Sequence, residues 1–250
     1  MSGRLAQRRI LVTGGGRGLG RAIALAAARE GAAVGVLGRT AQTLEETAAE
    51  ARSHGVGAAS AAADVADASA VEAAVSRLSE ALDGLDGLVT AAAVDCAWAP
   101  TGEMELAEWD RTIAVNLSGA FYCCRFALPH LVAAGSGAIV NITSVAGERA
   151  WADDVAYNAS KAGVELLTRT IAVEYAARGV RANCLAPGVI DAGMTNDLPT
   201  CDERERLRRL HPAGRFGTAE EVAEGAVWLL SDAASFTTGT TLRVDGGFLA

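Results

Sequence analysis

The chain has 250 residues, half of them hydrophobic and only 5% aromatic, which is enough for one large domain with a well-buried core. A formal net charge of -8 argues against nucleic acid or an anionic membrane as a partner, because these partners select basic surfaces. The five cysteines have no metal-ligand spacing and the three histidines lie far apart, so we expect no metal site. Without a signal-peptide pattern or an apolar run of bilayer length, we expect a soluble, cytoplasmic protein.

Strand-like and helix-like patterns alternate along the chain. In chain order we expect strand 10–13, helix 18–30, strand 33–37, helix 41–52, strand 56–63, helix 69–82, strand 88–92, helical pattern 106–134, strand 138–142, helix 157–177, strand 180–186, helix 219–230 and strand 240–244. Ser69 with Glu72, and Thr218 with Glu221, have the spacing of a capping box. Repeated strand–helix units predict a Rossmann-like α/β fold, a doubly wound parallel sheet of seven strands with helices on both faces.

The domain organisation is expected to be simple, because neither a Pro/Ser-rich linker nor a break in composition divides residues 1–250. The segment 191–212 differs from the rest in being polar and mixed in charge. Two interpretations stay open for it. It is either a solvated surface helix, since arginines alternate with acids, or a lid over a substrate pocket, as loops near α/β active sites often are.

A glycine-rich turn, Thr-Gly-Gly-Gly-Arg-Gly-Leu-Gly at 13–20, joins the first strand to the first helix. Glycines let the backbone approach a pyrophosphate, and the helix N-terminus supplies free N–H groups and a positive dipole end. The alternative is a tight turn without a ligand, but the position between strand and helix favours the dinucleotide. The candidate contacts are Gly14, Gly16, Arg17, Gly18, Leu19 and Gly20.

The end of the second strand indicates which dinucleotide is bound. An acid at this place would hydrogen-bond a ribose 2′-hydroxyl and repel a 2′-phosphate. Gly38 stands there instead, followed by Arg39, and Arg17 is expected nearby. Two exposed arginines without a ligand are the alternative. The combination predicts NADP(H) as the cofactor.

The candidate chemistry lies in Tyr157 and Lys161, which are four residues apart at a helix start and therefore share one face. A nearby ammonium is expected to lower the pKa of the phenol toward neutrality and make it a usable proton donor and acceptor. Ser144 follows the fifth strand, at the edge where open α/β sheets bind ligands. Asn116 falls inside the long helical pattern, where a locally bonded amide is the alternative.

The order glycine turn, Asp-Val, Asn, Ser, YxxxK, Pro-Gly and Val-Asp-Gly-Gly resembles the short-chain dehydrogenase/reductase family from about residue 5 to the end. The general layout is similar to 3-oxoacyl-carrier-protein reductases. The resemblance implies that Tyr157 protonates a carbonyl oxygen as hydride arrives and that Ser144 holds this oxygen. It also implies that Lys161 binds the nicotinamide ribose and tunes Tyr157, while Asn116 positions a water that relays protons.

The resemblance implies further cofactor contacts. They are Asp64 and Val65 at the adenine, the Ala91 backbone at the adenosine, Tyr157 and Lys161 at the ribose, and Pro187, Gly188 and Ile190 at the nicotinamide. Two departures from the family pattern stand out. Residues 90–93 read Thr-Ala-Ala-Ala where the family has Asn-Asn-Ala-Gly, so asparagine-mediated ties to the neighbouring strand are expected to be lost. Ala192 stands where the family often has a threonine that contacts the cofactor.

The sequence therefore predicts an NADP(H)-dependent oxidoreductase that interconverts a carbonyl and a secondary alcohol of a small molecule. The resemblance of 242–250 to the family ending implies a homotetramer, with a dimer as the alternative. The alternatives are a 3-oxoacyl-carrier-protein reductase and a non-catalytic NADP(H)-binding protein, disfavoured because all four catalytic positions are filled. The two tryptophans near the site suggest an apolar or ring-containing substrate, or else packing under loops. The candidate pocket residues are Asp95, Cys96, Trp98, Glu148, Arg149, Trp151, Asp153, Met194 and Leu198.

Overall fold

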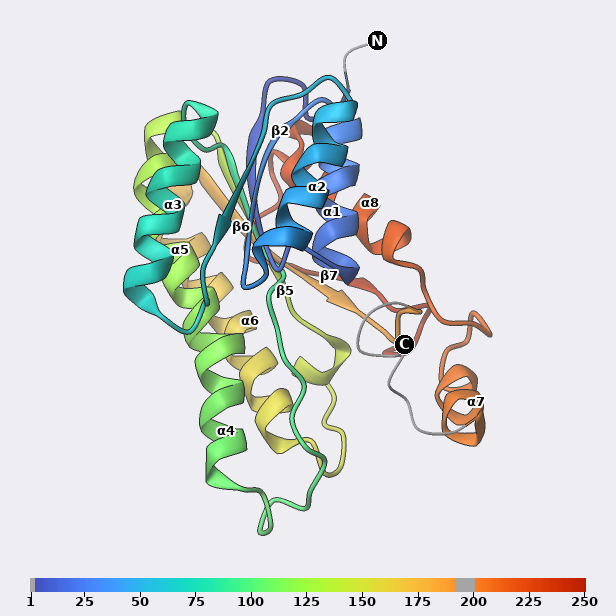
Figure 1. Ribbon diagram of the computed structural model, residues 1–250. Helices are drawn as coiled ribbons and strands as arrows, with labels where there is room; N and C mark the ends of the chain where they lie inside the picture. Colours follow the sequence, from blue (N-terminus) through green and yellow to red (C-terminus); the bar gives the residue numbers. More distant parts are fainter. Residues whose placement is uncertain (1–2, 192–200) are drawn as a thin grey trace.

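The computed structural model describes residues 3–191 and 201–250, without the side chains of 201–203, and within this part seven strands form one sheet (Figure 1). The strands are β1 (Arg9–Thr13), β2 (Ala33–Gly38), β3 (Ala58–Ala62), β4 (Gly87–Thr90), β5 (Gly137–Ile142), β6 (Val180–Pro187) and β7 (Thr241–Val244). Their order is β3-β2-β1-β4-β5-β6-β7 and every neighbouring pair is parallel. The predicted seven-stranded, doubly wound sheet is confirmed.

Helices cover both faces of this sheet (Figure 1). The helical elements are α1 (Gly18–Arg29), α2 (Ala41–Ser53), α3 (Ala68–Leu82), α4 (Leu106–Ile113), the π-helical turn η1 (Ala114–Ser118), α5 (Gly119–Ala134), η2 (Val145–Gly147), α6 (Val155–Tyr175), η3 (Ala176–Arg178), α7 (Cys201–Arg209), α8 (Ala219–Leu230) and η5 (Asp232–Ala234). Helices α1, α2 and α8 lie on one face, and α3, α5 and α6 lie on the other. Each face therefore closes its own apolar core.

The inner strands bury both of their faces, as parallel strands between helical layers must, whereas the edge strands β3 and β7 are largely half-buried. In β1, Ile10 and Val12 pack into the core under α1 and α8, while Leu11 between them packs into the core under α3 and α5. This alternation is the two-residue period of a strand expressed in apolar residues on both sides. It explains why the sequence shows short continuous apolar runs rather than alternating polar and apolar residues.

The predicted helix over 106–134 is continuous but not uniform. Helix α4 passes through the π-helical turn η1 into α5 without a break. Single π-helical turns inside α-helices are frequent at functional sites, and this one contains Asn116. By length and composition the run Leu106–Ala134 is the one helix of the described chain that is apolar enough to cross a membrane. Its α5 part packs against α3 and the sheet, so it is a core helix.

The predicted capping box at Ser69 and Glu72 is wrong. Asp67 caps α3 instead, and its carboxylate accepts hydrogen bonds from the backbone N–H groups of Ser69 at 3.0 Å and Ala70 at 3.1 Å. The helix starts one residue earlier than predicted, at Ala68, because the aspartate two residues before Ser69 satisfies the free N–H groups of the first turn.

The capping box at the start of α8 is confirmed, and it gives a stability prediction. The Thr218 hydroxyl accepts from the Glu221 N–H at 3.2 Å, and the Glu221 carboxylate accepts from the Thr218 N–H at 2.9 Å. Thr218→Ala is expected to lower the free energy of unfolding by about 0.5–2 kcal/mol, measured by chemical denaturation. Thr40→Ala is the matched control, because Thr40 is the N-cap of α2 but makes no side-chain cap bond. Equal losses in both variants would contradict the capping argument.

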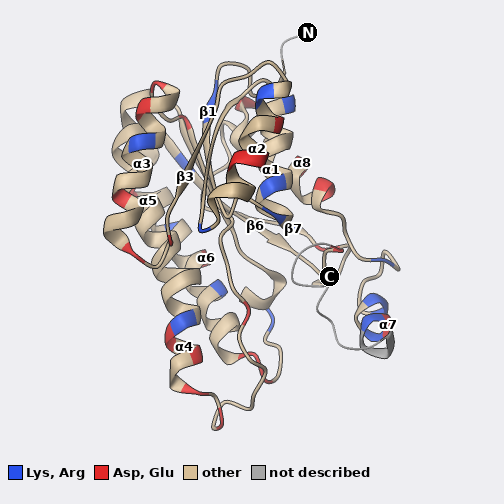
Figure 2. Cartoon of the chain, viewed as in Figure 1, with Lys and Arg blue, Asp and Glu red and all other residues tan. Residues whose placement is uncertain are grey.

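The polar segment 191–212 contains helix α7, which lies apart from the sheet in Figure 1. Of its described arginines, Arg206, Arg208 and Arg209 are exposed and Arg204 is half-buried. Glu205 pairs with Arg208 and Arg209, and Arg204 pairs with Asp191 (Figure 2). These observations agree with the surface-helix interpretation. Ala192 and the pocket candidates Met194 and Leu198 lie outside the described residues, so the lid interpretation stays a prediction.

Candidate active site

The candidate site lies where the strand order reverses. Strands β1 and β4 are neighbours in the sheet, and the chain builds outward from them in opposite directions, through β2 and β3 on one side and β5 to β7 on the other. In open parallel sheets the loops at the carboxyl ends of such strands separate and leave a crevice for a ligand. The glycine turn follows β1, the Thr-Ala-Ala-Ala segment 90–93 lies at the end of β4, and Ser144 follows β5. All three therefore lie at the carboxyl edge of the sheet.

The glycine turn has the geometry that a bound pyrophosphate requires. Gly14 has φ +66°, and a Cβ there would lie 2.9 Å from the Ala92 backbone. A Cβ on Gly20 would overlap the Gly14 carbonyl oxygen. Arg17, the N-cap of α1, makes no side-chain cap bond, so within the described chain no N-cap side chain satisfies the first-turn N–H groups of this helix. These residues fit a dinucleotide, whose phosphates would accept from the N–H groups of the turn.

The loop after β4 is bonded to the end of β1 through a side chain. The Thr13 hydroxyl at the end of β1 accepts hydrogen bonds from the backbone N–H groups of Ala91 and Ala92, both at 3.1 Å. Thr13 thus holds the loop after β4 against β1 and positions the Ala91 backbone. Sequence analysis missed this residue, although its place directly before the glycine turn was a usable signal.

The carboxyl end of β2 carries positive charge without a carboxylate. Arg17 and Arg39 are both exposed, and neither guanidinium forms an ion pair or hydrogen bond with the described residues. Gly38 has ordinary space around it, since a Cβ would lie 3.4 Å from Leu44 Cδ2 and 4.0 Å from Gly14 Cα. Position 38 therefore has room for an aspartate side chain, although the sequence has glycine there.

The residues expected at the adenine lie after β3. The Asp64 carboxylate accepts from the Ala66 N–H at 3.0 Å, which holds the turn. Val65 is buried against Gly119 of α5, where a Cβ would come within 2.8 Å of the valine side chain. The absence of a side chain at Gly119 thus allows Val65 to pack closely against α5.

Ser144 and Tyr157 are brought together although they lie on different elements. Ser144 ends the extended segment after β5 and caps η2, where its hydroxyl accepts from the Ala146 N–H at 3.1 Å. The same hydroxyl donates a hydrogen bond to the phenol of Tyr157, which stands in the first turn of α6. A serine and a tyrosine hydroxyl side by side form a pair of donors for one carbonyl oxygen.

Lys161 lies one turn further along α6, almost completely buried. Its Nζ donates to the Ile142 carbonyl at 3.0 Å and lies 5.4 Å from the centre of the Tyr157 ring. Burial lowers the pKa of Lys161 to about 8. Burial also raises the pKa of Tyr157, and the Asp95 carboxylate raises it further. The expected lowering of the Tyr157 pKa by Lys161 is therefore wrong for this structure, because the ammonium is bonded to a backbone carbonyl and burial dominates at the phenol.

The buried lysine gives a pH-dependent stability prediction. Its pKa falls from 10.5 to about 8 on folding, so between these values the unfolded chain binds more protons and stability rises with pH. Below pH 8 both states are charged, and burying the ammonium costs up to about 3 kcal/mol. We expect Lys161→Met to raise the free energy of unfolding most below pH 8, with a gain that shrinks toward pH 10.5. Denaturant midpoints of both proteins across this range measure the difference; a gain independent of pH would contradict it.

Asn116 is buried in η1, and its amide is fully engaged. Its Oδ1 accepts from the Val94 N–H at 2.8 Å, and its Nδ2 donates to the Val94 carbonyl at 2.9 Å and to Ser160 Oγ at 3.2 Å. The amide thus pins the loop after β4 to the start of α6. The alternative of a locally bonded amide is wrong, because Val94 and Ser160 lie 22 and 44 positions away along the chain. The water-positioning role stays a prediction.

The segment after β6 is held by a histidine that sequence analysis did not connect to the site. His211 is buried, its Nε2 accepts from the Val189 N–H at 3.1 Å, and its Nδ1 contacts the Leu207 carbonyl at 2.9 Å as a donor. A Cβ on Gly188 would lie 2.9 Å from this Nε2, so glycine is required. Pro187, Gly188 and Ile190 are thereby placed at the carboxyl end of β6.

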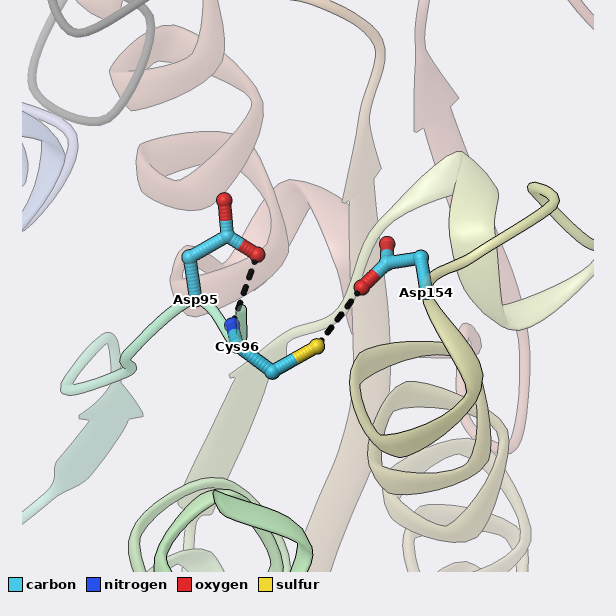
Figure 3. Close-up of side chains that lie close together, drawn as sticks. All are labelled: Asp95, Cys96 and Asp154. Carbon is cyan, nitrogen blue, oxygen red and sulfur yellow. Dashed lines mark hydrogen bonds between the residues drawn. The ribbon is translucent and has the colours of Figure 1, made fainter. Parts of the chain in front are cut away.

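The candidate pocket residues differ in their surroundings. Trp151 stacks on Phe248 with ring centres 5.4 Å apart, which agrees with packing under a loop. Trp98 is 57% exposed. Asp95 and Cys96 lie beside Asp154, which sequence analysis missed because it lies 58 residues away along the chain from Cys96 (Figure 3).

Comparison with known proteins agrees with this geometry. Residues 14–249 match a family described as enoyl-(acyl carrier protein) reductase. The chain is 42% identical to cis-4-hydroxycyclohexanecarboxylate dehydrogenase of Sinomonas cyclohexanicum, with 98% of both chains covered. It is 40% identical to 2-(S)-hydroxypropyl-CoM dehydrogenase 3 of Xanthobacter autotrophicus, with 100% of both covered. Carveol dehydrogenase from Mycobacterium avium, solved in complex with NAD, superposes with a TM-score of 0.94 at 28% identity, with 99% of both chains covered.

The chain therefore belongs to the short-chain dehydrogenase/reductase family, as its motifs predicted. It is an alcohol dehydrogenase of this family, an enzyme that interconverts a hydroxyl and a carbonyl group of a small molecule with a nicotinamide cofactor.

Proposed function

We propose that this enzyme is an NADP(H)-dependent oxidoreductase that interconverts a secondary alcohol and a ketone, with Tyr157 as the general acid and base. The observation that carries the proposal is the convergence of Tyr157, Ser144 and Lys161 beside the carboxyl end of β5. The phenol and the serine hydroxyl lie within hydrogen-bond distance of each other, so both can reach one substrate oxygen, to which Ser144 turns its proton when the substrate binds.

The nicotinamide supplies or accepts the hydride when it is bound. In the reducing direction, Tyr157 Oη donates its proton to the carbonyl oxygen while Ser144 Oγ holds this oxygen by a hydrogen bond. The high pKa of the buried phenol keeps it protonated and ready to donate. Because the pKa of Lys161 is near 8, both its charged and its neutral form are populated near physiological pH. We assign Lys161 to the nicotinamide ribose. Asn116 is proposed to position a water for the proton relay.

The choice of NADP(H) is supported by the charges at the end of β2. The guanidiniums of Arg17 and Arg39 have no partner among the described residues, and no acid occupies position 38. An arginine offers a planar set of donors that suits phosphate oxygens. Both arginines are therefore assigned to the 2′-phosphate. The residues from Gly14 to Gly20 bind the pyrophosphate, Asp64, Val65 and Ala91 the adenosine, and Pro187, Gly188 and Ile190 the nicotinamide.

The test is a panel of carbonyl compounds with NADPH, followed by the loss of absorbance of the reduced cofactor. The panel contains cyclic ketones, diketones and 3-oxoacyl thioesters. Turnover of ring ketones at rates above those of the thioesters supports the proposal, in keeping with the ring-containing substrate of the Sinomonas relative. Preference for the thioesters would favour a 3-oxoacyl-carrier-protein reductase, and binding of NADPH without turnover of any compound would favour a non-catalytic protein.

The proposed assembly is a homotetramer in the cytoplasm. Large apolar side chains are exposed on the solvent-facing sides of α5 and α6, with Phe121 at 43%, Leu166 at 64% and Val173 at 84% exposure. Such positions on α5 and α6 suit burial between subunits. We expect light scattering at micromolar concentration to give a mass of about four chains; a monomer would contradict the proposal. Residues 1–250 are proposed to form one domain, with 191–212 as a substrate lid.

A further inference from the structure

One buried imidazole joins helix α7 to residues 187–190, the segment proposed above to bind the nicotinamide. His211 stands two residues after the end of α7 and is 3% exposed. Its Nδ1 lies 2.9 Å from the carbonyl oxygen of Leu207, in the last turn of α7, and its Nε2 lies 3.1 Å from the backbone nitrogen of Val189. Because Val189 stands between Gly188 and Ile190, the imidazole contacts the middle of the segment.

The two partners define which nitrogen of the imidazole carries the proton. A carbonyl oxygen can only accept a hydrogen bond and a backbone N–H can only donate one. Nδ1 therefore donates its proton to Leu207, and Nε2 uses its lone pair to accept from Val189. A neutral imidazole has one donor and one acceptor, so both are used. The ring connects two segments and has no polar atom left for a substrate.

Packing holds this ring in its orientation. The centre of the Phe248 ring lies 5.1 Å from that of the imidazole, and the Phe216 ring meets it edge-on at 5.9 Å. Phe248 in turn stacks on Trp151, which lies between η2 and α6. The backbone of Gly188 approaches so closely that a Cβ there would lie 2.9 Å from Nε2. The ring therefore has little room to rotate out of its two hydrogen bonds.

The N–H groups on either side of Val189 are bonded to backbone. The Gly188 N–H donates to the Val244 carbonyl of β7 at 3.0 Å, and the Asp191 N–H donates to the Gly217 carbonyl at 2.8 Å. The Val189 N–H donates instead to a side chain that follows α7. The path of the chain at Val189 therefore depends on where the imidazole lies, and the imidazole is bonded to α7 through Leu207.

We propose that His211 is a positioning residue for the nicotinamide half of the cofactor. Through Val189 it sets the path of residues 187–190, and through Leu207 it links that path to the placement of α7. The inference rests on the proposed function, which assigns this segment to the nicotinamide. A histidine that only stabilised the fold would not favour the nicotinamide half of the cofactor over the adenosine half.

Two amide variants separate the two contacts of the imidazole. Counted in bonds from Cβ, the amide oxygen of glutamine takes the place of Nε2, and the amide nitrogen of asparagine takes the place of Nδ1. His211→Gln thus keeps an acceptor for Val189, whereas His211→Asn keeps a donor for Leu207. We expect His211→Asn to raise the Kd for NADPH about tenfold, because one backbone donor loses its partner, and His211→Gln to raise it at most about threefold. Fluorescence titration of NADPH measures both values.

The adenosine half of the cofactor is the internal reference. The compound 2′,5′-ADP has the adenine, its ribose and the 2′-phosphate but no nicotinamide. We expect its Kd, measured by calorimetry, to be the same in the parent and in both variants. If the parent prefers NADH, then NADH and 5′-AMP replace this pair of ligands. His130→Gln is the matched control, because His130 bonds to Ser79 near the end of α5 that leads into β5, away from the carboxyl edge of the sheet.

Three results of these titrations would overturn the inference. The first is an unchanged Kd for NADPH in His211→Asn. The second is an equal loss of NADPH affinity in His211→Gln and His211→Asn, which would mean that the ring acts only by packing. The third is an equal loss of affinity for NADPH and for 2′,5′-ADP, which would mean that the fold as a whole is damaged.

A measurement on the parent tests the inference even if both variants fail to fold. The chain has three histidines, so His211 is assigned in ¹⁵N spectra as the ring whose signals remain in His54→Gln and in His130→Gln. We expect this ring to carry its proton on Nδ1, and its Nε2 signal to shift on addition of NADPH but not of 2′,5′-ADP. A proton on Nε2, or equal responses to the two ligands, would overturn the inference.

The outcomes distinguish this inference from the proposed function. If ketones are reduced but His211→Gln and His211→Asn bind NADPH alike, the role of His211 is wrong and the function stands. If NADPH binds but no carbonyl compound is turned over, the proposed function fails, and the Kd values still decide the role of His211. If the parent binds neither NADPH nor NADH, both fail.

Discussion

Tyr157→Phe is expected to lower kcat/KM for the best ketone by about 10²–10⁴-fold, because the variant keeps the ring but loses the only phenol placed beside the carbonyl. The Ser144 hydroxyl remains, but it has no path to replace the proton that it would donate. The pKa of the phenol lies above its ordinary value, so the wild-type enzyme holds this proton across the physiological range. Initial rates with NADPH, together with cofactor binding followed by fluorescence, measure the two effects separately.

The matched control for this prediction is Tyr175→Phe, at the C-terminal end of the same helix. Tyr175 lies far along α6 from the first turn, and the ring that Arg178 covers is retained in the variant. We expect the control to keep the parent activity. Turnover of Tyr157→Phe within a few-fold of the parent, in a folded protein that still binds NADPH, would show that another group transfers the proton.

The second large effect concerns the cofactor. We expect the parent to prefer NADPH over NADH by at least about tenfold in kcat/KM, from one charge-assisted contact to the 2′-phosphate. The double variant Gly38→Asp, Arg39→Leu is expected to reverse this order, because it adds an acid for the 2′-hydroxyl and removes one cation. The aspartate fits without strain, since the Cβ position at residue 38 has only ordinary contacts. The preference should also shrink as salt is raised, because both arginines are exposed and screened.

Arg29→Leu serves as the control for a general loss of positive charge. Arg29 is exposed at the opposite end of α1 from the glycine turn, so its removal should leave the cofactor ratio unchanged. Equal use of NADH and NADPH by the parent, with no change in the double variant, would show that Arg39 is a surface residue without a ligand. The solved relative that contains NAD shows that the family fold accepts the smaller cofactor. The experiment therefore distinguishes NADP(H) from NAD(H) as the cofactor of this enzyme.

Much of the fold followed from local patterns in the chain. The two-residue period of β1, buried on both faces, and the glycine turn directly after it are readable because they depend on neighbours in sequence. The start of α3 was misread for a related reason. Two candidate caps, Asp67 and Ser69, stand two residues apart, and only the backbone path decides which carboxylate or hydroxyl reaches the free N–H groups.

The residues that carry the chemistry were also readable in part. Tyr157 and Lys161 share a helix face whatever surrounds them, and Ser144 follows a strand that must end at the ligand edge of the sheet. The pKa of Tyr157 was not readable, because it depends on burial and on Asp95, which reaches the phenol only through the fold. A lysine four residues away suggested a lower value, but the folded chain aims its ammonium at the Ile142 carbonyl.

By itself, the sequence determined the class of fold, the glycine cradle, the family and the identity of the candidate catalytic side chains, since each is encoded in spacing along one or two adjacent elements. Only the tertiary structure decided which distant groups meet. It brought Asp154 against Cys96 across 58 positions, Thr13 against the loop after β4, and His211 against Val189. These contacts join segments whose separation is set by sheet order and helix packing, and the side chains show no pattern along the chain that marks them as partners.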